Sequence, residues 1–212
     1  MKFSDNVIYC DNHLLVANKF AGWLTQPDGT ETVDLETSMK EWVKEAYHKP
    51  GAVFLHALHR LDRPVSGLVL FARTSKALSR LNEQVREGAI RRIYVAEVEG
   101  ILELKEGELE HSLLHGDHRA VLSTASEAKI ARLRYRVETF GEHHSRVMIE
   151  LETGRYHQIR AQFSAIGHPV LGDIRYGAKN GDGQTIRLHC IELMFAHPVT
   201  KEALHFKCPP PF

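Results

Sequence analysis

The sequence predicts a mixed α/β fold of the α+β class, and three observations support this prediction. Short apolar runs rich in β-branched and aromatic residues recur along the chain and dominate its second half. Three other segments repeat apolar residues at intervals of three and four, as amphipathic helices do. The 212 residues, 43% of them hydrophobic, suffice for one core, and no low-complexity linker divides them. We therefore expect a single domain over residues 1–212.

Two strands and a helix are expected in the first fifty residues. Residues 7–10 and 14–17 are apolar runs separated by a turn at Asp11-Asn12. Asp34 can cap the helix that follows, and Lys49-Pro50-Gly51 ends it. The apolar stripe of this helix consists of Leu35, Met39, Trp42, Val43 and Ala46.

A central strand is expected at residues 68–72, because an apolar run without alternation is typical of a strand covered on both faces. Thr74 or Ser75 then caps a second helix that ends at Gly88. The buried stripe of that helix is predicted to be Leu78, Leu81 and Val85. Residues 90–98 form the next predicted strand.

Strands are also predicted at residues 130–137 and 147–151, on either side of a turn at 141–144, and near residues 187–196. A third helix is expected to open at Thr153-Gly154-Arg155. Its packed face is predicted to be Ile159, Phe163 and Ile166. Tyr156 and Arg160 are four residues apart and would share one flank of this helix.

The charges balance to a net of zero, which by itself argues against a nucleic-acid partner. The balance conceals an asymmetry, because residues 60–92 carry eight basic and three acidic side chains. Residues 93–110 carry six glutamates and one lysine. A local basic face on a neutral protein is therefore possible.

Several classes of protein are excluded by what the sequence lacks. No apolar run approaches the roughly 20 residues that span a bilayer, and the N-terminus has no apolar segment typical of a signal peptide. Cys10, Cys190 and Cys208 are scattered and show no CxxC spacing, so we expect neither a disulfide framework nor a zinc site. These features indicate a cytoplasmic protein.

The segment His59-Arg60-Leu61-Asp62 runs into the predicted central strand and places one carboxylate among guanidiniums. The positive charge of Arg60 and Arg63 favours the ionised form of Asp62. An ionised aspartate can act as a nucleophile or as a general base. Asp62 is therefore the first candidate for a catalytic residue.

Four motifs in a fixed order give this segment a context. They are His59-Arg60-Leu61-Asp62 with Ser66-Gly67, Arg92-Ile93-Tyr94-Val95-Ala96, Gly154-Arg155-Tyr156-His157-Gln158-Ile159-Arg160, and Gly167-His168-Pro169 with Gly172-Asp173 and Tyr176-Gly177. The set resembles the signatures of the RluA-type pseudouridine synthases and spans about residue 8 to the C-terminus. Phe20 and Pro64-Val65 depart from the family pattern, and the resemblance implies a catalytic domain without the S4 domain of many relatives.

The resemblance implies a fold and a reaction. The fold is a large, mostly antiparallel, bent sheet flanked by helices, with a central RNA-binding cleft. The reaction converts uridine in RNA to pseudouridine without a cofactor, with Asp62 as the catalytic carboxylate. Tyr94 is expected to stack on the uracil ring, and Arg160 to pair with Asp62, with Arg155 as the second choice for this partner.

The resemblance also implies contacts with the RNA substrate. Arg60 is expected either to fill the space that a flipped uridine vacates or to hold a phosphate. The other predicted substrate-binding residues are His59, Arg92, Arg155, His157, Gln158 and Ile159. The expected partner is ribosomal or transfer RNA, and the protein is expected to act as a monomer without an obligate protein partner.

Two other readings of the sequence compete with this one. His56, His59 and Asp62 have a spacing that could serve a metal-dependent hydrolase, although no further ligand cluster completes a metal shell. The chain could also be a non-catalytic RNA-binding module on the same fold. Such a module would have no need of Asp62, Tyr94 and Arg160, so we expect an active enzyme with no bound metal.

Overall fold

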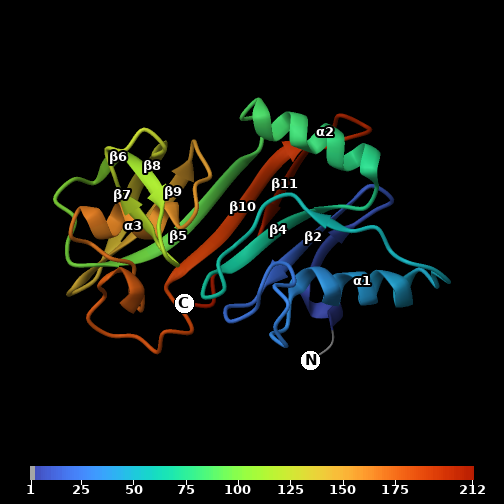
Figure 1. Ribbon diagram of the computed structural model, residues 1–212, viewed down its shortest axis with the longest axis horizontal. Coiled ribbons are helices and arrows are strands. Elements are labelled where there is room, and N and C mark those ends of the chain that lie inside the picture. The colour runs from blue at the N-terminus through green and yellow to red at the C-terminus, as the bar shows by residue number, and fades with distance from the viewer. Residues whose placement is uncertain (1–2) are drawn as a thin grey trace. The chain divides into compact units, whose positions relative to one another are not determined.

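The computed structural model describes residues 3–212, which fall into two compact units (Figure 1). Unit 1 comprises the chain up to Arg91 together with Cys190–Pro210. Unit 2 comprises Arg92–His189 and the last two residues. The single domain expected from the sequence stays a prediction, and each unit is described by itself.

Unit 1 is built on antiparallel strand pairs. Its elements, after the 3-10 helix η1 (Phe3–Asn6), are β1 (Val7–Cys10), β2 (Leu14–Lys19), α1 (Leu35–Ala46), β3 (His56–Ala57), β4 (Ser66–Ala72), α2 (Ser75–Arg86), β10 (Leu188–Ala196) from Cys190 on, and β11 (Ala203–Lys207). Strand β2 pairs with β1 and β4, β3 pairs with β4, and β10 pairs with β11. The predicted strands are confirmed, whereas the short β3 and β11 were not predicted.

Strand β4 is the buried centre of unit 1, as its unbroken apolar sequence predicts. All seven of its residues are buried, and β2 and β10 are its neighbours. Gly67, the second residue of this strand, has a φ of +118°, and a Cβ there would overlap the backbone of Cys190. A glycine is therefore required for β10 to lie beside β4.

Both helices of unit 1 begin at the predicted caps. The Asp34 carboxylate accepts a hydrogen bond from the backbone N–H of Thr37 at 2.8 Å. The Thr74 hydroxyl accepts one from the backbone N–H of Ala77 at 3.1 Å. In Figure 1 the strands β2, β4, β10 and β11 run between α1 and α2. Among residues 3–212 there is no helix long and apolar enough to span a membrane.

The buried face of α2 differs from the prediction at two positions, and the first is Leu78, which is only half-buried, whereas Ala77 is buried beside Leu81. Val85 is 45% exposed, whereas its neighbour Gln84 is buried. The Gln84 amide donates to the carbonyl of Ala196 at 2.8 Å and accepts from its N–H at 3.1 Å. The helix therefore docks on the end of β10 through a polar side chain, which rotates Val85 into solvent.

Unit 1 joins distant parts of the chain. The Asp11 carboxylate, in the turn between β1 and β2, accepts hydrogen bonds from the backbone N–H groups of His13 and Leu14. It also lies 2.9 Å from the Nε2 atom of His197, which follows β10. This contact ties the first hairpin of unit 1 to its C-terminal segment.

Unit 2 consists mainly of a second set of antiparallel pairs. Its elements are β5 (Arg91–Glu99), β6 (Glu106–His115), β7 (Ala120–Leu122), β8 (Lys129–Phe140), β9 (His144–Leu151), α3 (Gln158–Ala165) and the 3-10 helix η2 (Ile174–Tyr176). The strands lie in the order β5-β9-β8-β6-β7, and each neighbouring pair is antiparallel. Strands β6 and β7 were not predicted.

The sequence did not predict strand β6, because its closely spaced glutamates are typical of an acidic surface loop. In the structure they alternate along the exposed face of the strand, opposite arginines of β8. The opposed pairs are Glu106 with Arg136, Glu108 with Arg134 and Glu110 with Arg132. Opposite charges facing each other across a sheet stabilise the pairing of the strands, so much of the acidic excess of this segment is neutralised within unit 2.

Helix α3 begins later than predicted. His157 has a left-handed φ of 49° and precedes the first helical residue, Gln158. Tyr156 lies in the turn before the helix, so the expectation that it shares a helical flank with Arg160 is wrong. Ile159 and Phe163 are buried as predicted, whereas Ile166 lies beyond the end of the helix.

Candidate active-site residues

Asp62 lies in the loop that leads into β4, and its side chain is half-buried. The preceding residue, Leu61, is held by one buried hydroxyl. Thr25 Oγ1 donates to the Leu61 carbonyl at 2.8 Å and accepts from the Leu61 N–H at 3.0 Å. A single side chain therefore satisfies both backbone groups next to the candidate catalytic residue.

The residue after Asp62 is held as firmly. The backbone N–H of Gly22 donates to the carbonyl of Arg63 at 2.8 Å, and Arg63 Nε donates back to the Gly22 carbonyl at 3.1 Å. The Asp62 carbonyl accepts from the Val65 N–H at 3.0 Å, which closes the turn before β4. The Asp62 loop, residues 59–65, is thus fixed on both sides of the carboxylate.

A buried lysine completes this frame. Lys19, at the end of β2, is fully buried, and its Nζ donates to the carbonyls of Phe20, Trp23 and Arg63 at 3.1, 2.7 and 3.3 Å. Burial lowers the pKa of Lys19 to about 7, and the charge of Asp62 opposes this shift. Sequence analysis assigned no role to Lys19 or Thr25, because the contacts that join them to the Asp62 loop span 44 and 36 residues of the chain.

The other candidates on this loop differ in exposure. His59 Nε2 accepts a hydrogen bond from the backbone N–H of Leu70 at 3.3 Å, which directs that ring nitrogen towards β4. Arg60 is exposed. Within residues 3–212 there is no group of three His, Cys, Asp or Glu side chains placed to hold a metal ion, so the proposed ligands His56, His59 and Asp62 do not form such a group.

In unit 2, Tyr94 and Arg92 lie on β5. Tyr94 is 5% exposed and pairs across the sheet with Ile149. The Arg92 guanidinium lies against Gly154, where a Cβ would come within 3.1 Å of both terminal nitrogens. The motif at Arg92–Ala96 therefore contacts the motif at Gly154–Arg160. The absence of a side chain at Gly154 leaves room for the Arg92 guanidinium.

Arg160 has a buried carboxylate partner in its own unit. Its Nε lies 2.6 Å from Asp173 Oδ2, and its Nη2 lies 2.9 Å from Asp173 Oδ1. Both side chains are 5% exposed or less. This bidentate pair fixes the orientation of the guanidinium. Sequence analysis assigned no role to Asp173, although it lies in a quoted motif, and the pairing of Arg160 with Asp62 stays a prediction.

Gln158 organises the turn that precedes α3. Its Oε1 accepts from the Thr153 hydroxyl at 2.8 Å and from the Arg155 N–H at 2.9 Å, and its Nε2 donates to the Arg132 carbonyl at 3.0 Å. These bonds assign Gln158 a structural role that the sequence did not predict. Arg155 is exposed, and its Nε donates to the Ile130 carbonyl at 3.0 Å. Substrate contacts by Gln158, Arg155 and the buried Ile159 stay predictions.

His157 is buried and stacked. Its ring lies 3.8 Å from the ring of Tyr156, and its Nδ1 lies 3.0 Å from the Tyr176 hydroxyl. Burial lowers the pKa of His157 to about 3, and the nearby charges of Arg160 and Arg175 act in the same direction. The imidazole is therefore neutral at physiological pH, and its contact with RNA stays a prediction.

Comparisons with known proteins agree with the motifs. The family model described as RNA pseudouridylate synthase matches residues 13–165. The dual-specificity RNA pseudouridine synthase RluA of Pasteurella multocida is 35% identical over 212 residues, which cover 98% of this chain and 94% of that protein. Ribosomal large subunit pseudouridine synthase C of Escherichia coli is 32% identical over 222 residues, which cover 97% of this chain and 66% of that protein.

A solved structure supports the fold independently. Human RNA Pseudouridylate Synthase Domain Containing 4 superposes with a TM-score of 0.82 at 20% identity, covering 99% of this chain and 90% of that chain. The predicted α+β fold class is thus confirmed. Motifs, family match and fold agree, and the chain belongs to the RNA pseudouridylate synthase family, within its RluA type.

Proposed function

We propose that this enzyme isomerises specific uridines in ribosomal or transfer RNA, with Asp62 as the catalytic carboxylate. The N1–C1′ bond of the uridine breaks, the base turns, and a C5–C1′ bond forms. The proton on C5 leaves and N1 gains one, so the reaction balances without a cofactor. Attack of Asp62 on ribose C1′ and attack on uracil C6 both need an ionised carboxylate in a fixed position.

One observation carries this proposal: the backbone is held on both sides of Asp62. Thr25 binds both backbone groups of Leu61, and Lys19 and Gly22 both donate to the carbonyl of Arg63. A surface ion pair would need no such frame, whereas a catalytic carboxylate must keep its position to within a fraction of an ångström.

The roles of the other residues belong to the same proposal. Tyr94 stacks on the uracil and places its hydroxyl near C5, and Arg160 aims Asp62. Arg60 occupies the space left by the extruded uridine, because a base inside a folded RNA must leave its stack to react. Arg92 and Arg155 contact the RNA backbone.

The names of the relatives support the choice of substrate class. One relative is a dual-specificity RNA enzyme and another acts on the large ribosomal subunit. We propose that the present enzyme works on one of these classes of RNA, in the cytoplasm and as a monomer. We also propose that units 1 and 2 together form one catalytic domain over residues 1–212.

The test is a map of pseudouridine in total RNA from cells with and without the gene. Deletion should remove pseudouridine from at least one uridine of ribosomal or transfer RNA. Wild-type protein should restore that site, whereas Asp62→Asn should not. Asp5→Asn makes the same substitution at an exposed aspartate and should restore the site fully.

Two outcomes contradict the proposal. If deletion removes no site, the enzyme has no uridine substrate in these cells. If Asp62→Asn restores every lost site at wild-type protein levels, the catalytic role of Asp62 is wrong.

A separate measurement tests the metal-dependent alternative. Purified protein that keeps full activity after dialysis against EDTA would argue against that alternative.

A further inference from the structure

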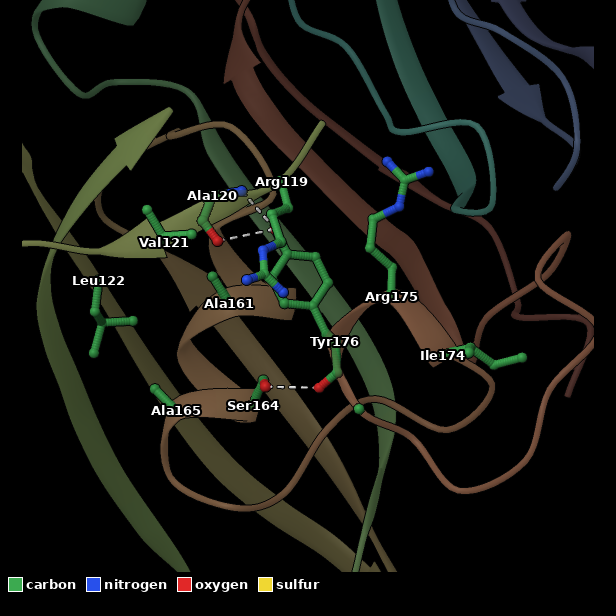
Figure 2. A pocket seen from close by; sticks show the side chains of 11 residues that line it. Arg119, Ala120, Val121, Leu122, Ala161, Ser164, Ala165, Ile174, Arg175 and Tyr176 are labelled. Carbon is green, nitrogen blue, oxygen red and sulfur yellow. Dashed lines mark hydrogen bonds between the residues drawn. The ribbon is translucent and has the colours of Figure 1, made fainter. Parts of the chain in front are cut away.

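Unit 2 contains a surface hollow of about 470 Å³ that none of the predicted site residues lines (Figure 2). It lies between β7, helix α3 and the 3-10 helix η2. Its floor includes Ala120, Ala161 and Tyr176, which pack together as one buried cluster. Small floor residues leave a space of the size that takes a small ligand or one unit of a polymer.

The charge of the hollow is positive. Arg119 and Arg175 line it and are exposed, and none of its eleven lining residues is acidic. Figure 2 shows the two arginines coming from different segments, Arg119 from the residue just before β7 and Arg175 from η2. The Arg175 guanidinium donates to the carbonyl of His118 at 2.6 Å, which ties it to the loop between β6 and β7. Asp117, in that loop, is 97% exposed and lies 3.4 Å from His118.

A stack of three rings lies beside the hollow. Tyr156 is 4.2 Å from the ring of His115 and 3.8 Å from that of His157, with interplanar angles of 16° and 19°. Two rings this close and this parallel to Tyr156 must lie on its opposite faces, because they would overlap on one face. Tyr156 is therefore sandwiched, and the stack ends at the exposed His115.

The stack and the hollow belong to one surface. His115 is the cross-strand partner of Ala120, so the two side chains lie on the same face of the β6–β7 pair. At the other end of the stack, His157 contacts the hydroxyl of Tyr176, which accepts from the Ala120 N–H at 2.7 Å. An aromatic stack therefore borders a hollow that two arginines line.

We propose that this surface is a second RNA-binding subsite, which takes an unpaired nucleotide of the substrate away from the target uridine. Arg119 and Arg175 bind its phosphate, and the base stacks on the exposed face of His115. Single-stranded RNA is recognised by such a combination of arginine–phosphate contacts and stacking on aromatic rings. The inference rests on the proposed function, because it assumes an RNA substrate.

The test measures binding alone, so that it is independent of catalysis. The probe is fluorescein-labelled oligouridylate of ten nucleotides, and the measurement is its fluorescence anisotropy at several salt concentrations. The double change Arg119→Gln with Arg175→Gln should weaken binding about tenfold or more. It should also lower the slope of log Kd against log salt by about 0.7 for each lost phosphate contact.

A matched variant separates this site from a general effect of charge. Arg134→Gln with Arg136→Gln removes two exposed charges from β8, also in unit 2, and should change Kd less than twofold. Equal losses in the two double variants, with unchanged thermal midpoints, overturn the proposal. Displacement of the probe by poly-glutamate as well as by unlabelled oligouridylate also overturns it, because the site would then bind acidic polymers of any kind.

The base is tested through His115. His115→Ala should weaken binding about five- to tenfold, and His115→Phe, which keeps a flat ring, should restore it. If both variants bind as wild type does, there is no stacking at this position. Asp62→Asn should bind the probe normally, so a failure of this proposal and a failure of the catalytic role of Asp62 give different results.

Discussion

Lys19 in unit 1 and Arg160 in unit 2 are both buried cations, and they are stabilised in different ways. In unit 1, Lys19 donates to three neutral carbonyls. In unit 2, Arg160 forms a bidentate pair with the buried carboxylate of Asp173. Lysine can lose its proton, and burial has already brought the pKa of Lys19 to about 7, whereas arginine keeps its charge.

The difference separates two ways to fix a functional segment. Lys19 binds backbone carbonyls of two loops, one at residues 20–23 and the other at Arg63. With a pKa of about 7, its amine is only partly protonated near neutral pH. The arginine fixes its own guanidinium in one orientation, and its charge is required because it neutralises a buried aspartate. We therefore expect the removal of Arg160 to lower the free energy of unfolding more than the removal of Lys19 does.

The largest expected effect follows from the loss of Arg160. Arg160→Met leaves Asp173 buried and unpaired, which should lower the free energy of unfolding by about 3–5 kcal/mol. The measurement is urea unfolding followed by circular dichroism. The double variant Arg160→Met with Asp173→Leu removes both charges and should recover most of the stability. No recovery would mean that packing, and not the buried charge, dominates.

Removing Lys19 should cost less. Lys19→Met removes one hydrogen bond from each of three carbonyls, two of which keep a backbone donor, and it leaves no charge unpaired, so we expect a loss of about 2–3 kcal/mol in the same unfolding experiment. The exposed Lys44 supplies the control, because Lys44→Met should change stability by less than about 0.5 kcal/mol. A larger loss for Lys19→Met than for Arg160→Met would reverse the comparison.

Thr25 tests whether the frame around Asp62 serves catalysis as well as stability. Thr25→Val keeps the shape and removes the hydroxyl, which leaves the N–H and C=O of Leu61 unpaired and should cost about 2 kcal/mol. Because the Asp62 loop loosens, kcat should fall about tenfold while KM for RNA changes little. Thr25→Ser keeps the hydroxyl and should restore both values, and an unchanged kcat in a folded Thr25→Val enzyme would confine the role of Thr25 to stability.

His157 gives the smallest expected effect, which depends on pH. The unfolded chain binds a proton on this histidine below about pH 6.5, whereas the folded protein binds it only near pH 3. The unfolded state therefore holds more protons between these values, and stability falls as the pH drops below 6.5. At pH 5.5 the loss should be about 1.4 kcal/mol relative to pH 7.5.

The pH experiment compares variants by thermal unfolding across this range. His157→Gln cannot be protonated and should show a shallower acid loss than the wild type. The exposed His56 provides the matched control, since His56→Gln should leave the pH dependence unchanged. Parallel curves for wild type and His157→Gln would show that His157 titrates normally in the folded protein.

The sequence predicted those features that depend on neighbouring residues. Asp34 and Thr74 were found as helix caps because a cap binds a backbone group three residues away. Strand β4 was found because its burial on both faces leaves an unbroken apolar run. The motif order also predicted the family, since each motif could be read within one short segment.

Features that join distant segments were not predictable in this way. Lys19 binds carbonyls at residues 20, 23 and 63, and only the fold brings the last of them near. Arg160 pairs with a carboxylate thirteen residues away, across the turn that ends α3. Strand β6 was hidden because its charges are neutralised by β8, which follows it in the chain.

The composition of unit 1 has a consequence for how the protein is made. Its strands β1, β2 and β4 are synthesised first, but β10 and β11 come only after the 98 residues of Arg92–His189. At bacterial or eukaryotic elongation rates, β4 must wait about 5–20 s on the ribosome for its neighbour β10. During that time unit 2, apart from its last two residues, emerges as one continuous stretch. Vectorial synthesis therefore favours unit 2 as the first part to mature, whereas β4 gains its neighbour β10 last.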